Sequence, residues 1–369
     1  MRIAPNWQAL TALVLIAAAL AGLPFTAAPG AVLALLILWL LALAALAALI
    51  APATSGLVAT FGVLSHAAVF LLLASLAGAE GTARPSFYAA LAAAWLLGWR
   101  LVTVLSGDGR RGSTGPGWGL GLVIPALFGL WILILWEAVV RGAGIPFVLL
   151  PPPSAIGHKI MASLPILAAD FHQTVLKAVL FGFVVGSLAG FLTALLADRY
   201  RFLARGLLPI GNMVSALPII GIAPIMVIWF GFDWPSKAAV VIVMTFFPML
   251  VNTLEGLRAS GAMERDLMRT YAASHWQSLF MLRLPAAMPF IFNGLKINST
   301  LAMIGAIVAE FFGTPIVGMG FRISTEVGRM NLDMVWAEIA LAAVVGSLFY
   351  GVLALIERIT THWHPSYRR

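Results

Sequence analysis

The sequence has no cysteine, only six histidines and few charged residues, which make up 10% of its 369 residues. Without cysteine, disulfides, iron–sulfur clusters and zinc sites built on thiolates are excluded. The histidines show no metal-binding spacing such as H-E-x-x-H, and the nearest approach to a phosphate-binding loop, GDGRRGS at 107–113, has Ser113 where lysine is needed. Nucleophile motifs such as G-x-S-x-G are missing as well. We therefore expect that the chain is not an enzyme and that it binds no metal and no cofactor itself.

Hydrophobic residues are abundant instead, at 62%, against roughly 45–50% in a soluble domain. In a bilayer, backbone polar groups must be satisfied within the segment, so helices of about 20 apolar residues are expected. The first apolar stretch could be a signal peptide ending near FTAAPGA at 25–31, but a second stretch follows at once, and we expect a retained helix. The predicted fold is all-α, a polytopic membrane bundle of about ten transmembrane helices. Their predicted ranges are 8–28, 31–50, 56–79, 86–105, 118–140, 174–197, 207–230, 237–254, 286–310 and 334–356.

Basic residues gather in four segments, which are 106–117, 198–206, 255–285 and the tail from 357. Because Lys and Arg in short loops favour the cytoplasmic side of a membrane, all four segments are expected there, together with both chain termini. The net charge of +8 is then explained by topology. We expect no nucleic-acid partner.

A polar segment, SGDGRRGSTGPG at 106–117, interrupts the apolar stretches and is typical of a linker. It predicts an N-terminal four-span extension at 1–110 and a second domain at 111–369. In the extension, His66 is a candidate ligand or proton-relay residue, and the favoured interpretation is a neutral imidazole bonded within the bundle. In the second domain, a stripe of small residues predicts close contact between two helices. This stripe consists of Gly182, Gly186 and Gly190.

The segment 255–285 carries helical signals outside the apolar stretches. Ser274 and Gln277 form a capping-box pattern, so a helix is expected to begin there, and Pro285 is expected to end it. A shorter helix is expected upstream, at 262–271. The two would form a knob suited either to a groove in another protein or to lipid headgroups, and periodicity alone does not decide between them. The predicted apolar face of the second helix, ended by a cation, consists of Trp276, Leu279, Phe280 and Arg283.

The same segment contains, in order, Asp266-Leu267-Met268, Ala272 and Leu282-Arg283-Leu284-Pro285. This order resembles the coupling motif E-A-A-x-x-x-G-x(9)-I-x-L-P of permease subunits in bacterial ATP-binding-cassette importers. The sequences at 286–313 and 148–156 resemble the nitrate/sulfonate/taurine branch of those permeases, and the resemblance covers residues 118 to 369. The chain departs from the motif with Asp for Glu, Leu and Met for the two alanines, and Ala for the glycine.

The resemblance implies an importer permease in a bacterial inner membrane, which forms the translocation path for a small solute such as nitrate, a sulfonate, taurine or a vitamin precursor. ATP would be used by separate cytoplasmic ATPase subunits that grip the loop at 262–285. The other implied partners are a second permease subunit in a homodimer, an extracytoplasmic solute-binding protein and membrane lipid. The implied coupling residues are Asp266, Arg269, Ala272, Ala273, Ser274, Trp276, Gln277, Phe280, Arg283, Leu284 and Pro285.

Candidates for the translocation path are mostly polar residues in or beside the predicted spans. Each could line a path or bond one helix to another, and for each alone bonding or packing is favoured. The alternative function is a secondary transporter that works without an ATPase; it predicts ionisable residues deep in the spans and an internal repeat, and neither is evident. A lipid-modifying membrane enzyme would need a cluster of acids or histidines. The path candidates are Met226, Trp229, Asn252, Asn293, Asn298, Ser299, Thr300 and Glu310.

Overall fold

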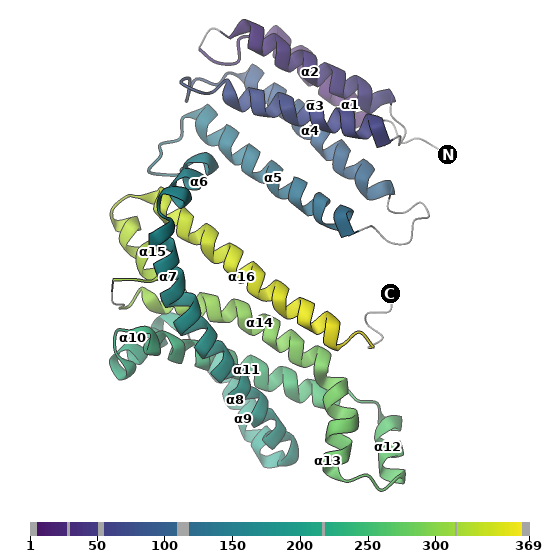
Figure 1. Cartoon of the computed structure of the whole chain (residues 1–369), viewed down its shortest axis with the longest axis vertical. Helices are drawn as coiled ribbons and strands as arrows, with labels where there is room; N and C mark the ends of the chain where they lie inside the picture. Colours follow the sequence, from purple (N-terminus) through teal and green to yellow (C-terminus); the bar gives the residue numbers. More distant parts are fainter. Residues whose placement is uncertain are drawn as a thin grey trace. The chain divides into compact units, whose positions relative to one another are not determined.

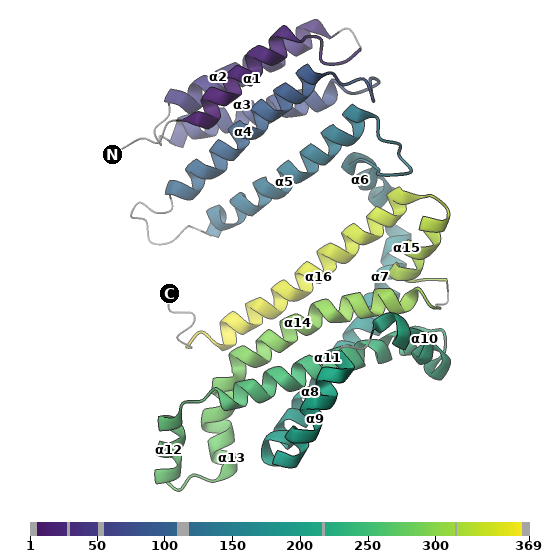
Figure 2. The same ribbon diagram turned by 180° about the vertical axis from the view of Figure 1, so that it is seen from behind.

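The computed structural model describes residues 6–27, 30–50, 55–108, 118–215, 218–313 and 316–363. Within these ranges every regular element is helical and no strand occurs, which confirms the predicted all-α class (Figures 1 and 2). The chain divides into two compact units, Met1–Ile156 (unit 1) and Gly157–Arg369 (unit 2). Residues 109–117 hold most of the predicted linker and lie outside the described ranges, so the domain boundary at 110–111 stays a prediction.

In the part of unit 1 that the structure describes, five apolar helices pack through alanine and leucine. Fully buried alanines such as Ala12 and Ala93 allow the helix backbones to approach closely. The first helix ends at Ala21 rather than near residue 28, because the chain turns at Gly22 and Pro24 cannot continue a helix. The helices are α1 Trp7–Ala21, α2 Ala31–Ile50, α3 Ser55–Ala74, α4 Pro85–Asp108 and α5 Trp118–Ala143.

Two polar groups of unit 1 make local hydrogen bonds. The Nδ1 atom of His66 lies 2.7 Å from the carbonyl oxygen of Gly62, one turn earlier in α3, which confirms an imidazole bonded within the bundle, but its buried Nε2 has no hydrogen-bond partner among the described residues. At the end of α5, Glu137 accepts hydrogen bonds from the backbone N–H (2.9 Å) and hydroxyl (2.7 Å) of Ser154, and it pairs with Arg141 at 3.2 Å. Ser154 lies in α6, Pro153–Ala162.

Unit 2 is built from long helical segments joined by short helices. Residues 164–199 form one continuous segment in which a π-helical stretch, η1, separates two α-helices. A second π-helical stretch, η2, lies within the continuous segment 275–310. The elements are α7 Leu164–Phe171, η1 His172–Val179, α8 Leu180–Arg199, α9 Arg201–Ser215, α10 Ile219–Phe230, α11 Trp234–Arg258, α12 Ala262–Thr270, α13 His275–Ser278, η2 Leu279–Arg283, α14 Leu284–Glu310, α15 Met319–Gly328 and α16 Leu332–Thr360.

In the described part of the chain, eight helical segments are long and apolar enough to cross a membrane, and α1, α9 and α10 are shorter apolar helices. A polytopic bundle is thereby confirmed. The single span predicted at 207–230 is wrong, because α9 ends at Ser215 and α10 begins only at Ile219, after an extended Pro218. Proline lacks the N–H that would continue the helix. The eight segments are Ala31–Leu49, Leu57–Ala74, Pro85–Ser106, Leu122–Ala143, Leu164–Arg199, Trp234–Arg258, His275–Glu310 and Leu332–Thr360.

The glycine stripe of α8 packs directly against α11, as predicted. A Cβ atom at Gly182 would lie 2.6 Å from the Cβ of Val241, and one at Gly190 would lie 3.0 Å from the Cβ of Met249. Real Cβ atoms almost never come as close as 2.6 Å, and 3.0 Å is tighter than most of their contacts, so glycine allows the two helices to touch here. Since α11 also packs along α14, these three helices form the centre of unit 2.

The two ends of unit 2 differ in the elements that they carry. In both views, α12 and α13 lie at one end and α10 and α15 lie at the other (Figures 1 and 2). We name the segment 262–283, which comprises α12, α13 and η2, the hairpin. The end that contains α15 is called the opposite end.

Candidate functional site

The turn of the hairpin is fixed by two backbone devices. After α12, Ala272 adopts a positive φ of 51°, and the N–H of Ala273 donates to the carbonyl of Met268 at 2.9 Å. This is the hydrogen-bond pattern of a Schellman motif, in which glycine is usual at the positive-φ position. The predicted capping box is confirmed: Ser274 N–H donates to the side chain of Gln277 at 2.7 Å, and Gln277 N–H donates to the hydroxyl of Ser274. The chain therefore leaves α12 and enters α13 with defined geometry.

Large apolar side chains of the hairpin are exposed. Trp276 and Phe280 are 63% and 59% exposed, and their rings stack with centroids 5.9 Å apart. Met263, Leu267 and Tyr271, spaced four residues apart, are also exposed. Exposed aromatic side chains on a projecting element mark a surface that contacts another molecule or a membrane.

The other side of the hairpin is bound to the bundle, so the predicted single apolar face of Trp276, Leu279, Phe280 and Arg283 is wrong. Leu279 is buried against Leu257 and Ala287. Arg283 forms a bidentate ion pair with Asp198, with N–O distances of 2.8 and 2.6 Å, and its Nε donates to the carbonyl of Leu257. A π-helical turn changes the angular spacing, which separates these residues from Trp276 and Phe280. The sequence carried no signal that Asp198, 85 positions away, is the partner of Arg283.

Pro285 does not end the helix, contrary to expectation. The hairpin continues through η2 into α14, so that residues 275–310 form one helical segment. Pro285 lies in the first turn of α14, directly after the π-helical turn. Proline is tolerated there because the wider π turn frees backbone groups that a regular helix would pair. The second half of the hairpin, α13 and η2, therefore continues without a break into the candidate membrane span that contains α14.

The three asparagines among the path candidates bond helices to one another. Asn293 donates to the side chain of Asn252 at 3.0 Å, which links α14 to α11. Asn298 is fully buried and donates to the hydroxyl of Ser187 and the carbonyl of Thr245, at 2.9 and 2.7 Å. Ser299 and Thr300 donate to carbonyls one turn earlier in α14, Met226 is half-buried, and Trp229 is exposed.

The opposite end of unit 2 holds a buried network of charged and polar groups. Glu310 accepts hydrogen bonds from the hydroxyl of Thr174 and the N–H of Gly320, both at 2.7 Å. Asp170 is fully buried and accepts from the N–H of Gly318 at 2.7 Å. It also pairs with the Nε of Arg322 at 2.8 Å, and this hydrogen bond raises the pKa of the Arg322 guanidinium. We call these residues the Asp170 network; it ties together α7, η1, α14 and α15.

The expectation that no ionisable residues lie deep in the spans is wrong. Lys237 is almost fully buried and donates to the carbonyl of Phe232 at 2.6 Å, and Lys296 pairs with Glu357 at 2.7 Å. Glu338 is also fully buried in α16. Lys237 bonds within its own segment, whereas Lys296 and Glu357 come from different helices, and a pairing between helices cannot be read from the sequence. No group of three His, Cys, Asp or Glu residues that could hold a metal ion occurs within the described ranges.

Known proteins resemble this chain over its second part. The family model described as "Binding-protein-dependent transport system inner membrane component" matches residues 182–362. A probable ABC transporter permease protein of Haemophilus influenzae is 31% identical over 238 residues, which cover 64% of this chain and 96% of that protein. This chain belongs to the ABC importer permeases. The formylaminopyrimidine transport permease protein ThiX of Halalkalibacterium halodurans is 30% identical, with 65% of this permease and 95% of that relative covered.

The taurine transport system permease protein TauC of Escherichia coli is 29% identical, with 63% of the permease and 86% of that relative covered. These matches confirm an importer permease of the nitrate/sulfonate/taurine type. The relatives are transport permeases rather than enzymes, and together with the apolar helices they support a multi-pass inner-membrane protein. Helices α1 to α7 and the π-helical stretch η1 lie outside the range that the family model matches.

Proposed function

We propose that this permease forms the translocation path of an ATP-driven importer and that a separate cytoplasmic ATPase subunit drives it through the hairpin. ATP is used by that partner, and the permease itself binds no cofactor. The observation that carries the proposal is the hairpin's construction, in which exposed apolar side chains project from an element that continues into the spanning helix α14. A groove in a partner protein would receive such an element through its aromatic side chains.

The contacts of the hairpin explain how a displacement of its tip would be transmitted to the translocation path. Arg283 joins the hairpin to Asp198 at the end of α8, and Leu279 packs against α11 and α14. Displacement of the hairpin would therefore move three helices together. A partner that changes shape on ATP binding and hydrolysis can bias a bundle with two conformations only if such a mechanical link exists.

The proposed assembly contains two copies of the permease, two ATPase subunits, an extracytoplasmic solute-binding protein and surrounding lipid. We place the hairpin and both chain termini in the cytoplasm, because Lys and Arg gather in the corresponding loops. The opposite end of unit 2, with its Asp170 network, then faces the solute-binding protein.

The proposed substrate is a small organic or inorganic solute such as nitrate, a sulfonate, taurine or a vitamin precursor. Two of the relatives, ThiX and TauC, are transport permeases for formylaminopyrimidine and taurine. For the path, we propose Asn252 and Asn293, since Asn293 is exposed beside the Asn252 amide on the central helices. Met226, Trp229, Asn298, Ser299 and Glu310 are retained as weaker candidates.

Co-purification tests the docking directly. The permease is co-expressed with its ATPase, and Trp276→Glu and Phe280→Glu are expected to reduce ATPase recovery about tenfold or more, since buried aromatic anchors typically contribute 2 kcal/mol or more to an interface. Met330→Glu is the matched control, because Met330 is 65% exposed and lies at the opposite end. Equal recovery with all three variants would reject docking on the hairpin.

A secondary transporter remains the second candidate, because ionisable residues are buried within the spans. Uptake into vesicles that contain the purified permease, with and without the ATPase and ATP, separates the two functions. Uptake driven by an ion gradient in the absence of the ATPase would favour the second candidate.

A further inference from the structure

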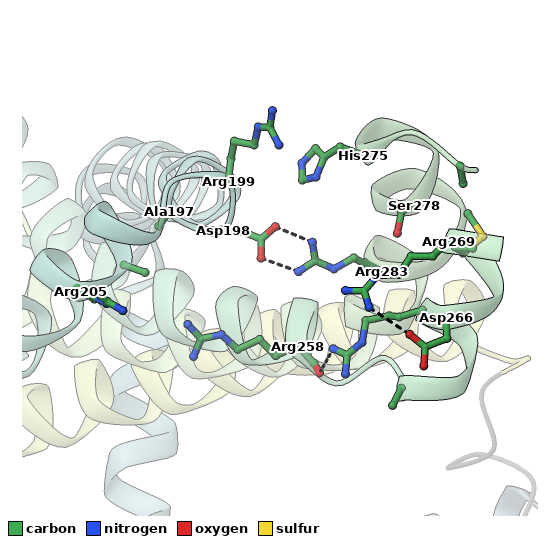
Figure 3. A pocket seen from close by; sticks show the side chains of 15 residues that line it. Ala197, Asp198, Arg199, Arg205, Arg258, Asp266, Arg269, His275, Ser278 and Arg283 are labelled. Carbon is green, nitrogen blue, oxygen red and sulfur yellow. Dashed lines mark hydrogen bonds and ion pairs between the residues drawn. The ribbon is translucent and has the colours of Figure 1, made fainter. Parts of the chain in front are cut away.

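A cavity of about 840 Å³ lies between the hairpin and the bundle, on the side away from the exposed aromatic residues Trp276 and Phe280, which do not line it. Its walls come from the ends of α8 and α11, the start of α9, and the hairpin (Figure 3). We call it the basic cavity. It is lined by six arginines, which are Arg199, Arg205, Arg258, Arg265, Arg269 and Arg283, and by only two carboxylates.

The carboxylates do not neutralise all of the arginines. Asp198 is occupied by Arg283, and Asp266 pairs with Arg269 at 3.2 Å. Arg199 and Arg205 make no ion pair or side-chain hydrogen bond with any residue that the structure describes. In Figure 3, Arg199 lies next to the Asp198–Arg283 pair, and Arg205 lies farther from it, beyond Ala197. Like charges that converge on one cavity attract an anion, and guanidinium groups match the geometry of phosphate oxygens.

The position of the cavity identifies the source of the anion. Arg199 and Arg258 are the last residues of two candidate membrane spans, so the cavity lies at the depth where the apolar segments end. Next to it, Tyr200 and Phe202 are 54% and 75% exposed. Exposed aromatic residues at the ends of spans are typical of the headgroup region, and basic pockets between helices at this depth bind phosphate headgroups.

We propose that the basic cavity binds the phosphate headgroup of an anionic phospholipid. Arg199 and Arg205 contact the phosphate, and the acyl chains lie along the apolar surface beside Phe202. The lipid occupies the space between the base of the hairpin, the end of α8 and the start of α9. That this lipid belongs to the cytoplasmic leaflet rests on the proposed function, whereas binding itself does not depend on an ATPase.

Lipid retention tests the proposal. The full-length permease is purified from vesicles of phosphatidylcholine with or without phosphatidylglycerol, and bound phosphatidylglycerol is measured by native mass spectrometry. Because each basic residue at an anionic surface contributes roughly fivefold to binding, R199Q/R205Q is expected to weaken retention about 25-fold. The control R84Q/R329Q removes the same charge from exposed loop and helix-end positions elsewhere, and it is expected to retain the lipid.

Three other results of this experiment would overturn the proposal or assign the cavity to another ligand. Equal retention in R199Q/R205Q and in the control would overturn the proposal. Displacement of phosphatidylglycerol by inorganic phosphate at millimolar concentration would also overturn it, because the site would then take the free anion. Loss of ATPase association in R199Q/R205Q, with lipid retention unchanged, would assign the cavity to an acidic segment of the ATPase instead.

The proposed function and this inference can be rejected independently of each other. Trp276→Glu is expected to release the ATPase and keep the lipid, since Trp276 does not line the cavity. R199Q/R205Q is expected to lose the lipid and keep the ATPase in detergent. If Trp276→Glu keeps the ATPase, only the docking proposal is rejected.

Discussion

At the opposite end of unit 2, Asp170 is fully buried and pairs with Arg322, and its network joins four helical elements. In the hairpin, Asp266 pairs with Arg269, but the two side chains are 70% and 82% exposed and belong to a single helix. Chemically similar pairs thus serve different purposes. Buried pairs fix the positions of several helices, whereas exposed pairs leave the hairpin's surface available for a partner. The comparison indicates a rigid support at one end and a contact element at the other.

The largest expected effect follows from neutralising the buried aspartate. Asp170→Asn leaves the Arg322 guanidinium without its counter-charge, and breaking a buried pair costs about 3–5 kcal/mol. Asp266→Asn makes the same chemical change in an exposed pair and is expected to cost less than about 1 kcal/mol. Thermal unfolding of both variants in detergent measures the difference. If both variants lost the same free energy of unfolding, the end that contains Asp170 would not be the rigid support that we assign to it.

Arg283 tests the link between the hairpin and the bundle. Arg283→Gln removes two charge-assisted hydrogen bonds and leaves Asp198 unpaired, so we expect a loss of about 2–3 kcal/mol. ATPase recovery is expected to persist while solute uptake per ATP hydrolysed falls. Arg258→Gln is the control, because its 3.7 Å pair with Glu255 is exposed. Unchanged uptake in Arg283→Gln would show that this ion pair does not transmit motion.

Ala272 tests the geometry of the hairpin turn. At φ 51° an alanine is strained by about 1–2 kcal/mol, part of which is offset by the greater flexibility of glycine in the unfolded chain. Ala272→Gly is therefore expected to stabilise the hairpin by about 0.5–1 kcal/mol and to slow hydrogen exchange of its amides. Ala273→Gly, whose φ is not positive, is expected to do the opposite. Faster exchange in Ala272→Gly would contradict the Schellman assignment.

An effect of comparable size is expected at the start of α11. The backbone N–H of Trp234 donates to Asp233 and lowers the pKa of that carboxyl. A carboxyl with a lowered folded-state pKa stabilises the protein above its unfolded pKa, and this stabilisation is lost as pH falls through the folded value. Asp233→Ala is expected to cost about 1 kcal/mol at neutral pH and progressively less in acid. If the loss of stability in Asp233→Ala stayed constant as the pH falls, this would contradict the role of the Asp233 carboxylate as a helix cap.

The sequence was informative where signals are local. The capping box of Ser274 and Gln277 and the glycine stripe of α8 were predicted, because each depends on residues within a few turns. The Asp170 network and the Asp198–Arg283 pair were not predicted, because their members come from distant helices. The helix end predicted at Pro285 was wrong for the same reason. The π-helical turn before Pro285 depends on tertiary packing rather than on the helix propensity of nearby residues.

The most direct test of the central claim uses the fact that the chain has no cysteine. A single cysteine is introduced by Tyr271→Cys, at an exposed position of the hairpin, and treated with a membrane-impermeant maleimide. Labelling is expected only in inside-out vesicles, and bound ATPase is expected to protect the thiol, whereas Met330→Cys is expected to react only in right-side-out vesicles. Labelling of Tyr271→Cys from the outside, or equal labelling with and without ATPase, would contradict the account.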